Sequence, residues 1–478
     1  PPPPPPPPRR TLPFITKLKP FYLFSFLILL LAISFTITQT HHYKKLFFGS
    51  LTLLHPKAKN MLKQISRNPI YTPPYCVLWM APFLSGGGYS SESWSYILAL
   101  HNYSMTKDLI FKLKIQQHGD LENLEFWEGL SLEMRNLAIE LYQTECKLNE
   151  TVVVCHSEPG AWYPPLFETV PCPPVGYGHF RGVVGRTMFE TDRVNDEHVK
   201  RCNLLDFVWV PTDFHVKTFS ESGVDPSKIV KIVQPVDLDF FDPAKYEALD
   251  FGSLGNLVMG LSNLGKKYVF LSIFKWEYRK GWDVLLRSYL KEFSGGDNVI
   301  LYLLTNPYHS DRDFGNKIVE YVKNSELEEP KDGWARVHVI DEHIAQVDMP
   351  RLYKAANAFV LPSRGEGWGR PIVEAMAMAL PVIATNWSGP TEYMTEDNSY
   401  PLPVDSMSEV AEGPFKGHLW AEPSVNKLQI LMRHVMRHHE EAKARGKQAR
   451  DDMMRRFSPE VVAGIVSDHI ERIIDRTQ

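Results

Sequence analysis

The chain has 478 residues, of which 44% are hydrophobic and 23% are charged. Its 52 lysines and arginines stand against 56 aspartates and glutamates, so the formal net charge is −4. This balance excludes a bulk electrostatic attraction to nucleic acid. The length suffices for two Rossmann-like cores with residues to spare.

The N-terminal part contains a proline run and one apolar segment. Eight prolines open a tail over residues 1–20, for which we expect extended polyproline II structure on the cytosolic side. The apolar run over 21–38 is long enough to span a bilayer, and no clear small-x-small cleavage site follows it. We therefore expect a single-pass type II signal anchor of the Golgi or endoplasmic reticulum, with residues 39–70 as a stem and the catalytic part in the lumen. The sequons at Asn102 and Asn149 suit that orientation.

Strands alternate with helical segments in the first half of the remaining chain. An apolar strand over 75–80 leads into a turn with Gly87 and Gly88, which by itself is typical of a flexible loop. Another apolar strand over 152–155 ends at His156, and a lone histidine in such a place is more often structural than catalytic. The five cysteines all lie in this half, which allows one or two disulfides and leaves at least one thiol unpaired.

Cations gather after the first apolar strand of the second half. The strand over 268–274 is followed by Lys275, Arg279 and Lys280, and a helix is expected from Trp282. Three cations at the end of a strand can neutralise a diphosphate leaving group without a metal ion. Taken singly, such a cluster is usually a solvated loop.

Two glutamates, Glu366 and Glu374, flank a glycine-rich turn between a strand over 358–361 and a helix of small residues. Pro371 suits the first helical position, so the helix N-terminus and its free N–H groups face the turn and favour a phosphate. Glu374, one turn into the helix, can accept two hydrogen bonds from a vicinal diol such as that of ribose. The alternative is a capped helix with two solvated glutamates.

A further turn over 386–392 follows the next strand, 381–385. Because the carboxyl ends of parallel strands meet at one edge of a sheet, this turn and the two before it should converge. It would add amides or a hydroxyl at the point where the glutamates and cations lie.

Residues 255–460 resemble the donor domain of the retaining GT-B glycosyltransferases of the family-4 type, also called glycosyl transferases group 1. The resemblance rests on the E-x7-E spacing of Glu366 and Glu374 and on the runs 352–358, 361–363 and 381–385 around it. It implies an α/β fold of two Rossmann-like doubly wound domains facing a cleft, preceded by one transmembrane helix. The implied boundaries are 71–250 for the acceptor domain, 251–458 for the donor domain and 459–478 for a helix returning to the first domain.

The resemblance also implies roles for individual residues. Glu374 would hold the nucleotide ribose, Glu366 would lie beside the donor sugar, and Lys275 and Lys280 would bind the diphosphate; Lys275 replaces the family's usual arginine. Glu190 stands where many relatives carry histidine, and His156 is a further catalytic candidate. The remaining expected donor-binding residues are Gly367, Trp368, Gly369, Gly87, Gly88, Ser388, Gly389, Thr391 and Ile344.

The expected function is that of a retaining, metal-independent glycosyltransferase. It would move a sugar from a nucleotide diphosphate sugar, with no other cofactor, to a hydroxyl of a glycan, lipid or protein acceptor that the sequence does not identify. No metal site is expected, and Asp237-Leu238-Asp239, which matches the D-x-D metal motif of another glycosyltransferase fold, is interpreted as part of the interdomain linker.

Three different classes of protein compete with this interpretation. The main one is a catalytically inactive, membrane-tethered nucleotide-sugar-binding or scaffold protein. It is mildly favoured by Glu190, which stands where many relatives carry histidine. The second is a glycan phosphorylase, which would carry a lysine-bound pyridoxal phosphate, and the third is a metal-dependent transferase. An absorbance scan of the purified protein would reveal pyridoxal phosphate, and loss of activity in a chelator would reveal a required metal ion.

Overall fold

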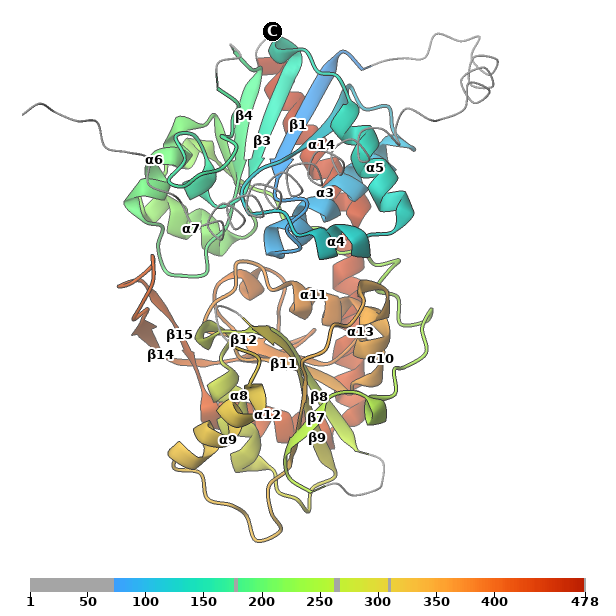
Figure 1. Ribbon diagram of the computed structural model, residues 1–478, viewed down its shortest axis with the longest axis vertical. Coiled ribbons are helices and arrows are strands. Elements are labelled where there is room, and N and C mark those ends of the chain that lie inside the picture. Colours follow the sequence, from blue (N-terminus) through green and yellow to red (C-terminus); the bar gives the residue numbers. More distant parts are fainter. Residues whose placement is uncertain (1–72, 176–178, 262–266, 308–310, 477–478) are drawn as a thin grey trace, which may run out of the picture. The chain divides into compact units, whose positions relative to one another are not determined.

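The structure, a computed structural model, describes residues 73–476 except for 176–178, 262–266 and 308–310. Within these residues the chain forms two sheets of largely parallel strands, flanked by helices, and one two-stranded hairpin (Figure 1). The expected anchor over 21–38, the tail before it and the stem after it lie outside the described residues. In the part that the structure describes, no helix has the length and apolar character needed to cross a bilayer.

The first sheet has six strands in the order β2-β1-β3-β4-β5-β6, and neighbouring strands are parallel. The central strand β3 is buried throughout, because helices cover both faces of the sheet. The strands are β1 (Tyr75–Ala81), β2 (Phe111–Gln117), β3 (Thr151–His156), β4 (Gly182–Arg186), β5 (Phe207–Val210) and β6 (Ile229–Lys231). The helices are α3 (Gly88–Ser104), α4 (Leu124–Gly129), α5 (Leu132–Gln143), α6 (Asp196–Leu204) and α7 (Asp213–Glu221).

The second sheet has seven strands in the order β13-β12-β11-β8-β9-β10-β7. Strand β7 pairs antiparallel with β10, and the other pairs are parallel. The strands are β7 (Asn256–Met259), β8 (Tyr268–Trp276), β9 (Val299–Pro307), β10 (Arg336–Ile340), β11 (Ala358–Leu361), β12 (Val382–Thr385) and β13 (Tyr400–Leu402). The helices that accompany it are α8 (Trp282–Glu292), α9 (Phe314–Asn324), α10 (Met349–Ala355), α11 (Arg370–Ala377), α12 (Val425–Arg437) and α13 (His439–Phe457).

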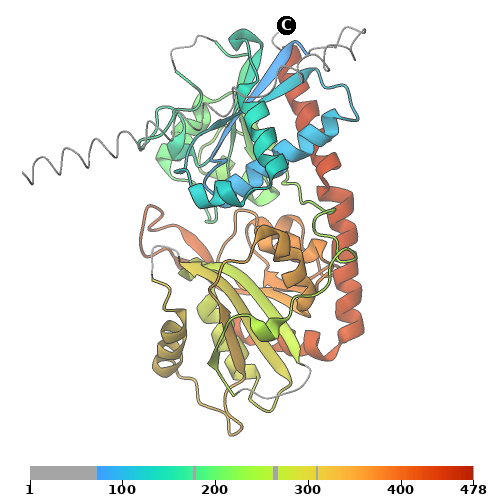
Figure 2. The same ribbon diagram turned by 45° about the vertical axis from the view of Figure 1, so that its right-hand side comes forward.

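The last helix, α14 (Pro459–Arg476), follows α13 directly and packs on α3 of the first sheet (red in Figure 2). Trp209 of β5 donates its indole N–H to His469 Nδ1 at 3.2 Å, and Ile470 and Ile474 are fully buried. Helix α13 in turn contacts α11 of the second sheet. The C-terminal stretch therefore joins the helical layers of both sheets.

Two elements begin or end differently from the expectation. Strand β8 continues to Trp276, whose ring stacks on Trp282 with centroids 4.8 Å apart, and the nine residues of β8 pair in register with β9. Lys275 therefore lies inside the strand, opposite Asn306, rather than in the turn after it. Helix α3 begins at Gly88, inside the turn expected around Gly87 and Gly88.

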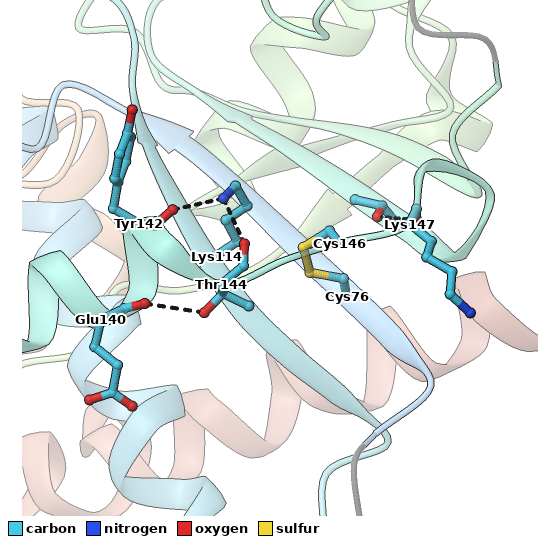
Figure 3. Close-up of a disulfide and its surroundings, with 8 residues drawn as sticks. Cys76, Lys114, Glu140, Tyr142, Thr144, Cys146 and Lys147 are labelled. Atoms are coloured by element: carbon cyan, nitrogen blue, oxygen red, sulfur yellow. Dashed lines mark hydrogen bonds between the residues drawn. A yellow bond between two sulfur atoms is a disulfide. The ribbon is translucent and has the colours of Figure 1, made fainter. Parts of the chain in front are cut away.

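Two disulfides link the elements of the first sheet. Cys76 on β1 bonds to Cys146, which follows α5, and Cys155 on β3 bonds to Cys172. Close to the first bridge, Lys114 Nζ on β2 donates to the carbonyl oxygens of Tyr142 and Thr144 at 2.7 and 2.6 Å (Figure 3). These carbonyls end α5, so the lysine caps that helix and ties it to the sheet. Cys202 is a buried free thiol.

The D-x-D sequence has a local role in the fold. Asp237 Oδ1 accepts hydrogen bonds from the backbone N–H groups of Asp239 and Phe240 at 3.1 and 2.9 Å, and Asp239 pairs with Lys245. Asp237 thus closes a turn between the two sheets. Among the described residues no group of three or more His, Cys, Asp and Glu side chains is arranged to hold a metal ion.

Candidate active site

Glu366 lies in the turn between β11 and α11 and forms the centre of a charge cluster. Lys280 Nζ donates to both of its carboxylate oxygens at 2.7 and 2.8 Å, and Arg279 Nη1 lies 3.6 Å from Oε2. Burial alone would raise the pKa of Glu366, but the charges of Lys280 and Arg279 outweigh it and hold the pKa below the ordinary value. The carboxylate is therefore ionised at neutral pH.

The backbone of the same turn is held in one conformation by close packing. Gly369, which precedes α11, has a φ of 92°, and a Cβ there would lie 2.9 Å from Tyr393 Oη. Tyr393 donates its hydroxyl to the carbonyl oxygen of Trp368 at 2.6 Å. Glycine is therefore required at Gly369, and Pro371 sits in the first turn of α11 as expected. A Cβ on Gly367 would meet Met188 at 2.7 Å, so the loop after β4 also packs on this turn.

Glu374 lies one turn into α11. Tyr353 on α10 donates its hydroxyl to Glu374 Oε2 at 2.9 Å, and Arg370 Nε is 3.9 Å from Oε1, which is too far for a hydrogen bond. Burial raises the pKa of Glu374, and the charge of Arg370 and the bond from Tyr353 offset only part of that rise. Tyr353 thus orients a carboxylate that lies at the N-terminal end of the helix.

Three buried donors at this helix end have no acceptor among the described residues. They are Nε and Nη1 of Arg370 and Nε1 of Trp368. A buried donor that stays unpaired costs about 1–3 kcal/mol, so such groups call for a partner. An anionic ligand at the N-terminus of α11 would supply acceptors for them, and the free N–H groups of the helix would face the same ligand. The donor set therefore fits a phosphate-bearing ligand.

The turn after β12 meets the Glu366 turn, as expected from the strand order. Ser388, with a φ of 59°, accepts the backbone N–H of Glu366 on its Oγ at 3.0 Å. Gly389 donates its N–H to the Glu366 carbonyl at 2.9 Å. Thr391 donates its hydroxyl to the Ser388 carbonyl at 2.6 Å. The Ser388 hydroxyl therefore joins the two turns, and the Thr391 hydroxyl holds the backbone within the second turn.

The β8–α8 turn supplies two cations. Gly281 has a φ of 68°, and a Cβ there would overlap the Pro362 carbonyl oxygen, so glycine brings this turn against the end of β11. Arg279 Nη1 donates to the Gly365 carbonyl at 2.7 Å. The structure thus brings Arg279 and Lys280 to Glu366, while the side chain of Lys275 is exposed on β8. Sequence reasoning counted Arg279 among three cations that can neutralise a diphosphate, but the family resemblance assigned the diphosphate to Lys275 and Lys280 alone.

Glu190, after β4 of the first sheet, lies against this cluster. Its Oε1 is 3.7 Å from Arg279 Nη2, and a Cβ on Gly365 would overlap its carbonyl oxygen. Its side chain is 37% exposed. The residue expected on the acceptor side is thus in contact with the Glu366 turn.

His156 does not lie at a surface that a substrate can reach. Its ring is fully buried, and Nδ1 accepts the indole N–H of Trp79 at 3.1 Å, which places the ring proton on Nε2, 3.2 Å from Glu92 Oε2. Burial lowers the pKa of His156. Arg186 donates to Glu92 Oε1 through Nε and Nη2 at 2.8 and 2.6 Å. The histidine is therefore a neutral member of a buried ion-pair network that anchors α3, which corrects its expected catalytic role.

Of the remaining candidates, Gly87 and Ile344 lie outside helices and strands, and Gly88 is the first residue of α3. Gly87 precedes α3 and donates its N–H to Ser85 Oγ at 3.2 Å, and a Cβ on Gly88 would meet nothing within 4 Å. Open space at Gly88 permits the close approach of a ligand. Ile344 lies in the loop after β10 and is half-buried. Their expected contacts with the donor stay predictions.

Arg370 and Tyr353 were missed by the sequence reasoning. Arg370 carried one usable signal, because it stands next to Pro371 of the first helical turn and so lies at the ligand end of α11. Tyr353 carried none, since its hydroxyl reaches Glu374 from a separate helix, 21 residues earlier in the chain.

The fold belongs to a known class. The sucrose-phosphate synthase of Thermosynechococcus elongatus superposes with a TM-score of 0.56 over 84% of this chain and 100% of its own, at 14% identity. The crystal structure of Anabaena Alr3699/HepE in complex with UDP and glucose superposes with a TM-score of 0.54 over 83% and 100%, at 12% identity. At such identities the likeness concerns the fold, which is the α/β GT-B-like glycosyltransferase fold.

A family match covers the segment that carries the site. Residues 265–413 match the model of the family described as glycosyl transferases group 1. The O-antigen chain mannosyltransferase B of Escherichia coli is 35% identical over 96 residues, 19% of this chain and 24% of that protein. The mannosylfructose-phosphate synthase of Agrobacterium fabrum is 28% identical over 142 residues, 29% and 27% of the two chains. The matched segments span about a quarter of the length of these relatives.

Proposed function

We propose that the chain is a retaining, metal-independent glycosyltransferase that moves a sugar from a nucleotide diphosphate sugar to an acceptor hydroxyl. One observation carries the proposal: the buried, unpartnered donors of Arg370 and Trp368 lie at the N-terminus of α11, next to Glu374 and the Glu366–Lys280 pair. A phosphate-bearing donor with a ribose diol satisfies these groups together.

In this proposal the cations act on the leaving group. The bond between the sugar C1 and the diphosphate oxygen breaks, and negative charge develops on that oxygen. Lys280 has three N–H donors, and Glu366 accepts two of them, so the third can reach the leaving group. Arg279 and the helix N-terminus add to the stabilisation of this charge, which takes the place of a metal ion.

The acceptor oxygen then forms the new bond to C1 on the face that the diphosphate leaves. Its proton passes to the departing phosphate oxygen, so that no side-chain nucleophile is required and the configuration at C1 is retained. Glu366, held ionised by its cations, lies where it can orient the hydroxyl groups of the donor sugar or stabilise positive charge at C1.

Two further properties belong to the proposal. The Anabaena relative in fold was solved with UDP and glucose, which makes uridine diphosphate sugars the first donors to test. The apolar run over 21–38 supports membrane anchoring as a type II protein, with the two sheets in the lumen of the Golgi or endoplasmic reticulum.

Removal of the Glu374 carboxylate charge tests the donor site. We expect Glu374→Gln to weaken UDP binding by roughly 10- to 100-fold, because charged hydrogen bonds to the ribose are lost. The measurement is calorimetric titration of the full chain with UDP, followed by donor hydrolysis in EDTA across a panel of nucleotide sugars. Glu320→Gln, which changes an exposed glutamate on α9, is the matched control.

Each outcome has a meaning. Wild-type UDP affinity in Glu374→Gln would remove the assigned role of Glu374. Turnover that stops in EDTA and returns with a divalent cation would contradict metal independence. UDP binding without turnover of any donor or acceptor would favour the inactive nucleotide-sugar-binding protein.

A further inference from the structure

A hairpin of the second sheet's lobe reaches the first lobe. Its strands are β14 (Val404–Glu409) and β15 (Leu419–Pro423), seen at the left edge of Figure 1. Leu419 and Asp192 exchange two hydrogen bonds, in which the Asp192 N–H donates to the Leu419 carbonyl at 2.9 Å and the Leu419 N–H donates to Asp192 Oδ1 at 2.6 Å. A third hydrogen bond joins Thr191 Oγ1 and His418 Nδ1, which are 2.9 Å apart. The hairpin is therefore fixed to the loop after β4.

The other end of the hairpin is fixed to the donor turn. Ala421 donates its N–H to the Arg364 carbonyl at 2.9 Å, and Arg364 Nε donates to Glu422 Oε1 at 2.9 Å. Arg364 is fully buried and lies two residues before Glu366. The hairpin thus joins the acceptor-side loop to the turn that carries the charge cluster.

Between the hairpin and the first lobe lies a cavity of about 750 Å³. This volume falls within the range of small-molecule sites. One wall comes from the hairpin loop with Phe415 and Lys416, and the other from the residues after β3 and the start of α6, with Glu158, Phe167, Asn195 and His198. Because both walls are fixed by hydrogen bonds, the cavity is formed in advance of any ligand.

The lining carries charges of both signs, Arg193 and Lys416 against Glu158, Asp196 and Glu197, and two of these side chains are in ion pairs. Arg193 donates to Asp192 at 2.7 Å, and Glu197 accepts from Lys200 and Arg201 at 2.6 and 3.0 Å. Burial and the neighbouring Arg201 lower the pKa of His198 to about 4, so it is neutral at pH 7. A phosphate or a polyanion would find no free cluster of cations here. The lining instead offers apolar rings and polar groups without a dominant charge.

Phe167 and Phe415 provide the apolar part of the lining. Phe167 is 43% exposed, and the ring of Phe415 is held edge-on to Phe189 at 5.1 Å between centroids. The polar part includes the Glu158 carboxylate and the Asn195 amide, beside the charged side chains and histidines. Ring faces beside a few hydrogen-bonding groups match a sugar ring, which has apolar C–H faces and an edge of hydroxyl groups.

One lining residue, Glu158, is linked electrostatically to the transfer site. Burial raises the pKa of Glu158, and the charges of Asp120 and Glu190 add to that rise. Glu190 is in turn 3.7 Å from Arg279 of the Glu366 cluster. The lining of the cavity is therefore coupled through Glu190 to the charge cluster of the donor turn.

We propose that this cavity binds a neutral saccharide as the acceptor of the transfer, with Phe415 and Phe167 on opposite sides of a sugar ring. The proposal rests on the proposed function and adds the acceptor class, an uncharged glycan, to it. The hairpin over 404–423 is then the element that selects the acceptor.

The test is binding of the full chain to an array of neutral oligosaccharides. Sialylated and sulfated glycans form a second arm, and phosphatidylserine vesicles form a third. We expect binding to neutral glycans that falls roughly tenfold or more in Phe415→Ala and in Phe167→Ala, because each loses one stacking face. Leu204→Ala, which removes an exposed aliphatic side chain from α6 outside the cavity, is the matched control and should bind as the wild type does.

Several results would overturn the proposal. They are wild-type affinity in both phenylalanine variants, binding to the acidic glycans or the vesicles alone, and no binding in any arm. Hydrolysis of a nucleotide sugar by the same wild-type preparation separates the two hypotheses. If hydrolysis persists while neutral glycans fail to bind, the acceptor site is wrong and the proposed function stands. If UDP binding and hydrolysis are also absent, the proposed function fails.

Discussion

Lys280→Ala is expected to lower the rate of sugar transfer by roughly two to three orders of magnitude, the loss typical of removing one donor that stabilises transition-state charge. Lys280 is the cation nearest to Glu366, and its third N–H is the one assigned to the leaving diphosphate. The effect should fall mainly on kcat, because the charge on the leaving oxygen develops in the transition state. Steady-state kinetics with the active donor is the measurement.

Two further variants serve as controls for Lys280→Ala. Lys280→Arg keeps the charge but changes its geometry, so it should recover part of the rate. Lys291→Ala removes an exposed lysine at the end of α8 and should have the wild-type rate. Thermal unfolding of Lys280→Ala distinguishes a chemical defect from a folding defect, since Glu366 keeps Arg279 at 3.6 Å. Full activity in Lys280→Ala would contradict the role of Lys280 as the cation that stabilises the leaving diphosphate.

The second large effect concerns stability. We expect Glu92→Gln to destabilise the fold by about 3–5 kcal/mol, because the fully buried Arg186 guanidinium would lose its only carboxylate partner in the described structure. Chemical denaturation, read by tryptophan fluorescence, measures the change, and Trp79 lies inside the network. Glu197→Gln, at an exposed ion pair, should change stability by less than about 1 kcal/mol.

The same network predicts a pH dependence with a definite sign. Burial opposes ionisation of Glu92, but Arg186 and His156 lower its pKa from the ordinary 4.5 to about 2. A carboxyl whose pKa is depressed in the folded state contributes its stability above the ordinary pKa and loses it as the pH falls toward the folded value. The contribution, roughly 3 kcal/mol, should therefore disappear between pH 4.5 and pH 2.

A double variant separates the ion pair from simple packing. Glu92→Met with Arg186→Met removes both charges, so no charge is left buried and unpaired, and its stability should exceed that of Glu92→Gln. If Glu92→Gln were as stable as the wild type at pH 7, the interpretation of Glu92 and Arg186 as a buried ion pair that anchors α3 would be wrong.

The candidate donor site could be predicted where its signals are local in the chain. The glycines, Pro371 and the glutamates of the β11–α11 turn lie within nine residues, and each has a chemistry that a helix N-terminus explains. The meeting of this turn with Ser388 and Gly389 also followed from the sequence, because adjacent parallel strands bring their carboxyl ends to one edge.

Which cation reaches Glu366 could not be predicted in the same way. The stacking of Trp276 on Trp282 extends β8 by two residues, so Lys275 stays on the strand and Arg279 enters the cluster. This depends on contacts between a strand and a helix, which spacing along the chain does not encode. The burial of His156 also depends on tertiary contacts, because the residues of its network, Trp79, Glu92 and Arg186, come from three separate elements.

The sequence alone was sufficient to locate the turns at the strand ends and to predict the kind of ligand they suit, because glycine conformation, helix capping and charge act over a few residues. Tertiary structure decided which side chains meet: the Arg279–Glu366 contact, the Tyr353–Glu374 bond and the cavity beneath the β14–β15 hairpin. These join segments from 21 to more than 200 residues apart, and their geometry is set by the packing of whole strands and helices.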